Sequence, residues 1–144
     1  MSDNPQDAVE IISGIESVED ASELARLDAA VTSLLSSAYP ERGMGALLRV
    51  FERFPDQDGY GVFWSILHGL EGLPGYEEAL IESIRRQPSE FSLLMVSRML
   101  NAGRTHVNGT DLLGLLDEVA RNPDYSAALH KEAGRLTEWQ RRRA

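Results

Sequence analysis

The sequence predicts an all-α protein in which seven to eight short antiparallel helices stack as an α-solenoid or small superhelix. Three observations lead to this fold class. Apolar residues recur with the i, i+3, i+4, i+7 period of a helix along most of the chain. Proline and glycine interrupt that period every 10 to 20 residues or so, and no stretch alternates apolar and polar residues as a half-buried strand would. Short connections make consecutive helices neighbours, and the 144 residues fit a single domain, 1–144.

Three helices are expected in the first third of the chain. Residues 6–15 form a short one within a segment, residues 1–16, that we expect to be loosely attached. Residues 17–39 form the second, which begins with acidic residues suited to a first helical turn and ends at Pro40. Residues 41–54 form the third. The apolar residues expected to be buried are Val9, Ile12, Leu24, Leu27, Val31, Leu34, Leu35, Met44, Leu47, Leu48, Phe51 and Phe54.

The chain is organised around one central stretch, residues 56–71. Pro55 ends the preceding helix, and the Asp58-Gly59 pair can turn the chain and cap the next one. From about residue 60 this next helix carries two stripes, one apolar and one mixed. Within the mixed stripe we expect Trp64 to lie in the core and His68 to be partly buried and hydrogen-bonded. The apolar stripe contains Phe63, Ile66, Leu67 and Leu70, and the mixed stripe contains Tyr60, Trp64, His68 and Glu71.

Two helices follow the Gly72–Gly75 turn, at residues 76–87 and 90–101. The second is apolar on nearly every side, so we expect it to be central and to pack against the helix that starts near residue 60. Ser89 can cap its start and Gly103 can end it. The residues of these two helices expected to be buried are Tyr76, Leu80, Ile81, Ile84, Phe91, Leu93, Leu94, Met95, Val96, Met99 and Leu100.

The last part of the chain predicts two more helices after a loop at residues 104–109. Thr110 is expected to cap the seventh helix, and Asn122-Pro123-Asp124 separates it from the eighth. We expect residues 140–144 to form a frayed tail. Three segments that each combine a hydrophobe, a charged residue and a closing proline, ending at Pro55, Pro88 and Pro123, recur about 35 residues apart and favour a helical-hairpin repeat. The residues expected to be buried are Leu112, Leu115, Leu116, Val119, Leu129, Ala133, Leu136 and Trp139.

Charge is distributed unevenly along the chain. Residues 1–90 carry 17 Asp and Glu against 6 Arg, whereas residues 91–144 carry 6 against 8 Lys and Arg, within a net charge of −9. This balance argues against nucleic-acid binding and fits steering toward a basic partner, although many soluble proteins are simply acidic. The chain has no cysteine, and no signal peptide or bilayer-spanning run is visible, so we expect a cytoplasmic protein.

Catalytic chemistry finds little support, and we expect no enzyme activity, no cofactor and no metal site. His68 and Glu71 are three residues apart and could share a metal ion, but no third ligand is marked in the sequence. No serine stands in a nucleophile elbow. The glycines around Gly59 and Gly61 follow no strand, which excludes a phosphate-binding loop.

Binding to another protein has better candidates. Acidic residues cluster in two consecutive helices and the loops before them, and two aromatic residues lie among them. Aromatic anchors surrounded by carboxylates suit a basic protein surface. The alternative is that Trp64 belongs to the core, which we favour for this residue taken alone, and that the acids form a solvated face. The predicted partner-binding residues are Asp56, Asp58, Tyr60, Trp64, Glu71, Glu77, Glu78 and Glu82.

Three segments resemble small all-helical immunity proteins of bacterial polymorphic toxin systems, of the Rhs, contact-dependent or type VI kind. They are Gly61-Val-Phe-Trp-Ser-Ile-Leu-His-Gly-Leu-Glu71, Pro74-Gly-Tyr-Glu77 and Leu93-Leu-Met-Val-Ser-Arg-Met-Leu-Asn-Ala-Gly103. The resemblance implies a HEAT-like architecture and an antidote that binds one cognate toxin domain. The acidic charge indicates a basic toxin, of the nuclease or nucleotide-modifying class. A helical scaffold or adaptor without inhibitory function is the alternative, followed by an uncharacterised hydrolase or metal protein.

Overall fold

The computed structural model describes residues 5–143, and within them it is all-α apart from one two-stranded hairpin. Each predicted helical segment contains a helix. The elements are α1 (Pro5–Gly14), α2 (Ala21–Leu35), the 3₁₀ turn η1 (Pro40–Gly43), α3 (Met44–Arg53), the 3₁₀ turn η2 (Gly59–Gly61), α4 (Val62–Glu71), α5 (Tyr76–Arg86), α6 (Glu90–Asn101), β1 (His106–Val107), β2 (Thr110–Asp111), α7 (Leu112–Arg121) and α8 (Ala127–Arg143).

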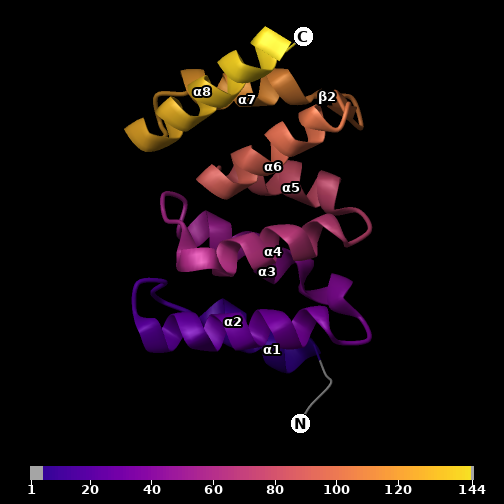
Figure 1. Cartoon of the computed structure of the whole chain (residues 1–144), viewed down its shortest axis with the longest axis vertical. Coiled ribbons are helices and arrows are strands. Elements are labelled where there is room, and N and C mark those ends of the chain that lie inside the picture. Colours follow the sequence, from indigo (N-terminus) through magenta and orange to yellow (C-terminus); the bar gives the residue numbers. More distant parts are fainter. Residues whose placement is uncertain (1–4, 144) are drawn as a thin grey trace.

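The helices follow one another in chain order along the long axis of the molecule (Figure 1). The α1–α2 layer forms one end, α3 with α4 and then α5 with α6 come next, and the α7–α8 layer forms the other end. The principal packing contacts link helices that are close in sequence, such as α1 with α2 and α3, α3 with α5, and α8 with α6 and α7. None of the described helices is both long and apolar enough to cross a membrane.

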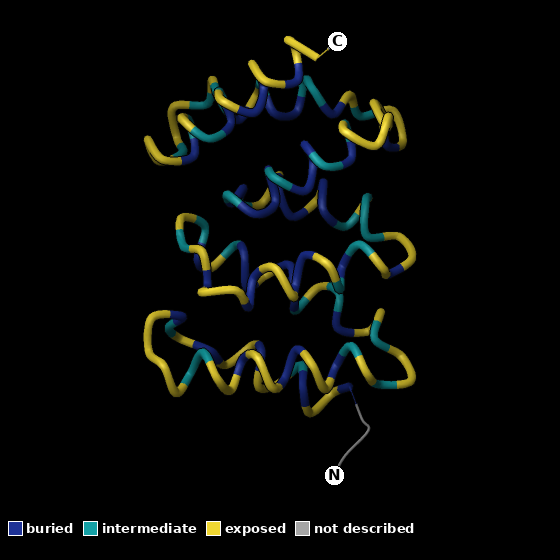
Figure 2. The backbone as a smooth tube through the Cα atoms, viewed as in Figure 1, coloured by how far each residue is buried: buried dark blue, intermediate teal, exposed yellow. Residues whose placement is uncertain are grey.

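Buried residues line the inside of every layer, whereas exposed ones occupy the loops and the outward helical faces (Figure 2). Three phenylalanines from different helices meet at the centre. The ring centroids of Phe51 and Phe63 lie 5.3 Å apart, those of Phe63 and Phe91 5.4 Å, and those of Phe51 and Phe91 5.5 Å. These contacts confirm the prediction that the central helix packs against α6 and mark the aromatic core that supports the α4 start.

Proline separates the two helices of each later layer. The helices α3, α5 and α7 all end two residues before Pro55, Pro88 and Pro123. A proline ring disfavours helical geometry in the residue before it, and Gln87 and Asn122 accordingly adopt extended backbones, with ψ of 107° and 115°. The recurring proline segments therefore mark the same position, the end of the first helix, in three successive layers.

Several predicted boundaries need correction. The second helix begins at Ala21 and not at residue 17, because the Asp20 carboxylate caps it by accepting the backbone N–H groups of Ser22 and Glu23. The third predicted helix is divided into η1 and α3. Thr110 belongs to β2 and does not cap α7; Asp111 holds the cap position. The Ser89 cap of α6 is confirmed, with reciprocal bonds to Ser92.

The loop before α7 contains a hairpin that the sequence prediction missed. His106 pairs with Asp111 and Val107 with Thr110 across an Asn108-Gly109 turn. Both turn residues have positive φ, 47° and 81°, as in the two-residue type I′ turn that Asn-Gly favours. The Asn108-Gly109 dipeptide is the sequence feature from which this hairpin could have been predicted.

Both terminal segments are tied to the body of the protein where the structure describes them. Residues 1–4 and 144 lie outside the described residues. Ile12 and Ile15 of the first segment are buried, and the Arg53 guanidinium donates to the Ile12 carbonyl at 2.8 Å. At the other end, the buried Gln140 amide donates to the Ser97 hydroxyl at 2.8 Å. The described parts thus differ from the predicted loose segment and frayed tail, because each contributes buried side chains.

Candidate partner-binding surface

The start of α4 is built around three consecutive residues with positive φ. Gly59, Tyr60 and Gly61 have φ of 62°, 48° and 94°, and the Asp58 carboxylate accepts the Tyr60 backbone N–H at 3.1 Å. Glycine is required at the first position, since a Cβ there would lie 2.3 Å from the Phe63 ring. Tyr60 is therefore outside α4, and its side chain is 70% exposed. The helix predicted to start near residue 60 starts at Val62, and Tyr60 belongs to the preceding η2 turn.

Trp64 follows one turn later and is also turned toward solvent. Its side chain is 43% exposed, and its ring meets Phe91 edge-on at a centroid distance of 5.5 Å. The predicted core position for Trp64 was wrong because α4 buries its other stripe, Phe63, Ile66, Leu67 and Leu70. His68 is also exposed, contrary to its predicted partial burial; it lies beside Trp64 and within 3.8 Å of the Glu71 carboxylate.

Carboxylates from two separate parts of the chain, the loop before α4 and the start of α6, lie close together in this region. Asp56 and Asp58 are exposed and take part in no ion pair among the described residues. The Glu90 backbone N–H donates to the Pro55 carbonyl at 2.9 Å, which holds the start of α6 against the same loop. Burial, followed by the charges of Glu132, Asp56 and Asp58, raises the pKa of Glu90. We call Asp56, Asp58, Tyr60, Trp64 and Glu90 the helix-start surface.

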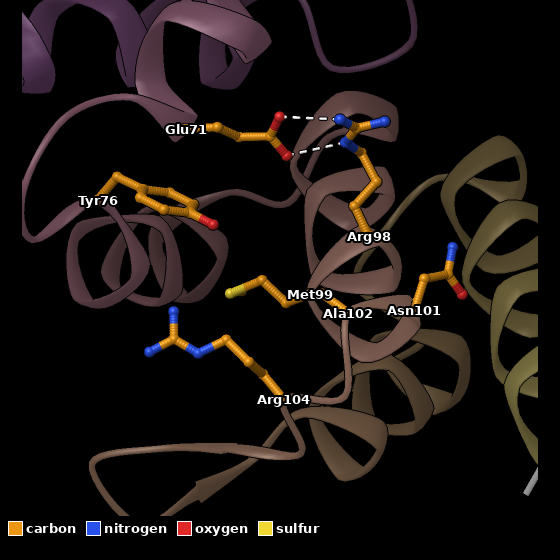
Figure 3. Close-up of a pocket in the computed structure, with 7 residues that line it drawn as sticks. All are labelled: Glu71, Tyr76, Arg98, Met99, Asn101, Ala102 and Arg104. Carbon is orange, nitrogen blue, oxygen red and sulfur yellow. Dashed lines mark hydrogen bonds and ion pairs between the residues drawn. The ribbon is translucent and has the colours of Figure 1, made fainter.

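The acidic residues at the other end of α4 have cationic partners. The Arg98 guanidinium holds Glu71 through two hydrogen bonds of 2.8 and 2.9 Å, and Arg104 pairs with Glu77. These pairs adjoin a pocket of about 410 Å³, in which Figure 3 shows Glu71 and Arg98 joined on one side and Tyr76 beside them. Burial, together with the charges of Glu77 and Glu71, raises the pKa of Tyr76. We call this the paired end.

The eight predicted binding residues therefore do not form one surface. Four of them, Asp56, Asp58, Tyr60 and Trp64, belong to the helix-start surface. Glu71 and Glu77 belong to the paired end: Glu71 is the last residue of α4, and Glu77 lies in the first turn of α5. Glu78 and Glu82 are exposed on α5, where they border a shallow groove against the Asn108 turn.

Sequence reasoning missed Glu90 as a member of the helix-start surface and Arg98 and Arg104 as partners of the acids. The sequence did contain a signal for Glu90. Pro55 lies in the loop before α4 and Pro88 in the loop before α6, so the residues that follow them occupy equivalent positions in adjacent layers. Both arginines stand 27 residues after the acid they hold. That separation has no local pattern, so only the folded chain reveals these pairs.

No group of three or more His, Asp or Glu side chains in residues 5–143 is arranged to hold a metal ion. No protein-family model matches the chain, and no curated protein or solved structure shows significant similarity to it.

Proposed function

We propose that this protein binds and neutralises a cationic toxin domain one-to-one, as an immunity protein of the polymorphic-toxin kind, and that its layers are antiparallel hairpins of a HEAT-like solenoid. The observation that carries the proposal is the conformation of Tyr60. A non-glycine residue in the left-handed region costs about 1 kcal/mol or more. Here that conformation holds a phenol ring in solvent, two residues after the exposed Asp58, whose carboxylate accepts the Tyr60 backbone N–H.

The chemistry of the helix-start surface fits a basic protein as its occupant. Tyrosine and tryptophan are the residues that most often dominate the energy of an interface. Carboxylates around them accelerate the encounter with a positive surface and oppose acidic competitors. Toxins that act on nucleic acids or nucleotides need cationic clefts for phosphate, so a domain of that class would match both features. The resemblance of residues 61–71 to immunity proteins supports the same choice.

The proposal predicts that a toxin domain is encoded next to the gene for this chain, and the experiment uses that domain as the partner. Co-expression should protect cells from that toxin, and the purified pair should associate at a rate that falls as salt rises. Tyr60→Asn is the most informative variant, because asparagine tolerates the left-handed backbone. We expect it to keep or raise the thermal stability of the protein while weakening toxin affinity about tenfold to a hundredfold.

A matched pair of charge changes locates the interface. Asp56→Lys and Glu78→Lys alter the net charge equally, but only Asp56 belongs to the helix-start surface. We expect Asp56→Lys to slow association about tenfold at low salt and Glu78→Lys to change it far less. Equal slowing would place the contact elsewhere. Tight binding without protection would indicate the adaptor alternative, and the absence of any binding would refute the proposed function.

A further inference from the structure

Helix α8 carries a basic stripe on the side that faces away from the protein. Leu129, Ala133 and Leu136 bury the other side of this helix against the core. Trp139 is 46% exposed within the stripe, and the Arg143 guanidinium lies 5.8 Å from its ring centroid. The stripe consists of Lys131, Arg135, Trp139 and Arg142, which helical spacing places in one row.

The charge of this helix opposes that of the whole molecule. Residues 127–143 carry five Lys and Arg against two Glu, whereas the complete chain has a net charge of −9. Arg135 pairs with Glu132, and Arg141 pairs with Asp117. Among the described residues, Lys131 and Arg142 make no ion pair. Two cations in the same row as an exposed tryptophan are thus left available for another molecule.

The α1–α2 layer, at the opposite end of the molecule, is acidic and so complements the charge of the α8 stripe. Residues 5–35 carry seven Asp and Glu against one Arg, and no ion pair joins any of the described residues 5–43. Ile11 on α1 is 37% exposed, and Asp7 lies one turn before it on the same helix, with Glu10 adjacent. This end layer therefore presents uncompensated acids and one large apolar side chain.

We infer that the α8 stripe docks on the α1–α2 layer of a second copy of this chain, so that molecules associate end to end. Each end supplies the charge that the other lacks, and each exposes one large apolar residue, Trp139 or Ile11. The two surfaces differ, so every added copy leaves one free stripe and one free acidic layer, and the assembly grows beyond a dimer. The net charge of −9 opposes a nucleic acid and also a second copy, so association depends on the local match between the basic stripe and the acidic α1–α2 layer.

Sedimentation velocity of the full chain tests this inference. At about 20 mM salt we expect a concentration-dependent mixture of monomer and larger species, which returns to monomer at about 300 mM because exposed charges are then screened. Lys131→Gln with Arg142→Gln should lower the association constant about tenfold, since two exposed charge pairs are lost. Asp7→Asn with Glu10→Gln should do the same.

Mixing these two double variants gives the sharpest readout. Each retains one intact surface, so the mixture should form one-to-one heterodimers and no larger species. The control is Arg49→Gln with Arg85→Gln, which removes two exposed cations from α3 and α5 and should leave self-association almost unchanged. Thermal unfolding checks that every variant is folded.

Three results would overturn the inference. A wild-type protein that stays monomeric at low salt and high concentration rules it out, and so does a control variant that associates as weakly as the stripe variant. The third is a fluorescent single-stranded oligonucleotide that binds the monomeric wild type and not the stripe variant, which would assign the stripe to nucleic acid.

Discussion

Both ends of α4 carry acidic and aromatic residues, but the two ends differ in ion pairing and in exposure to solvent. At the helix-start surface, Asp56 and Asp58 have no cationic partner among the described residues, and two aromatic side chains stand in solvent. At the paired end, Arg98 and Arg104 hold Glu71 and Glu77, and Tyr76 is partly buried between them. A count of acidic residues therefore does not locate a binding surface. What matters is whether the fold supplies each carboxylate with a cation.

The largest expected effect concerns the aromatic core beneath the helix-start surface. Phe63→Ala should lower the free energy of unfolding by about 3–5 kcal/mol, because it empties a fully buried position that contacts Phe51 and Phe91. Leu67→Ala, also fully buried, should cost about 2–5 kcal/mol. Leu94, which the sequence placed in the core, is only partly buried, so Leu94→Ala should cost less than either. Urea denaturation measures all three, and a loss below about 1 kcal/mol for Phe63→Ala would contradict this assignment.

A second prediction distinguishes the cost of a steric clash from the cost of a positive φ in the turn before α4. Gly59→Ala should cost about 2–4 kcal/mol, since its Cβ would collide with the Phe63 ring in addition to the cost of positive φ. Gly61→Ala has the same backbone problem but nothing within 4 Å of the new Cβ, so it should cost only about 1–2 kcal/mol. Equal losses in thermal unfolding would show that Phe63 moves aside freely.

A third prediction tests the paired end. Arg98→Ala should lower stability by about 1 kcal/mol or less, because its bond to Glu71 is bidentate but solvent-accessible. Asp56→Asn should leave stability almost unchanged, since no cation is lost there. Equal losses in the free energy of unfolding for the two variants would contradict the assignment of a cationic partner to Glu71 and of none to Asp56.

The smallest expected effect concerns how Glu90 and Glu77 contribute to folding stability as the pH changes. The two contributions have opposite signs. Burial and neighbouring acids raise the pKa of Glu90, so ionised Glu90 disfavours the folded state, and its penalty grows as pH rises from its ordinary value to the raised one. Burial also acts to raise the pKa of Glu77, but its own backbone N–H and Arg104 outweigh this and lower it. Glu77 thus adds stability above its ordinary pKa, and this is lost as pH falls through the lowered value.

Glu90→Gln should therefore be more stable than the wild type at pH 7, and Glu77→Gln less stable. Both differences should shrink in acid, toward about pH 4 and below. Chemical denaturation across this range measures them. Two variants that shift in the same direction would show that the ends of α4 do not differ electrostatically in the way described.

Helical periodicity made most of the fold predictable. The stripe Phe63, Ile66, Leu67 and Leu70 is buried as predicted, because a period near 3.6 places these residues on one face wherever the helix lies. The Ser89 cap could also be predicted, since a cap is a local interaction.

The candidate site was harder to predict because its character depends on contacts between layers. Trp64 lies on a second stripe of α4, and only the position of α6 decides that one edge of its ring is covered. No feature of the sequence distinguishes Glu71 from Asp58. In the folded chain, however, the Arg98 guanidinium donates to the Glu71 carboxylate. Tyr60 is a local error: glycine on both sides of it favours a turn with positive φ over a helix start.

The succession of layers also governs how the chain folds and opens. Because the principal contacts link helices close in sequence, little chain entropy is lost before each contact forms, and such topologies fold rapidly. The α1–α2 layer can dock α3 and α4 as soon as these helices are synthesised, without waiting for the C-terminus. Layers that have a neighbour on only one side should open first, so amide hydrogens in α1 and α8 should exchange with solvent faster than those in α4 and α6.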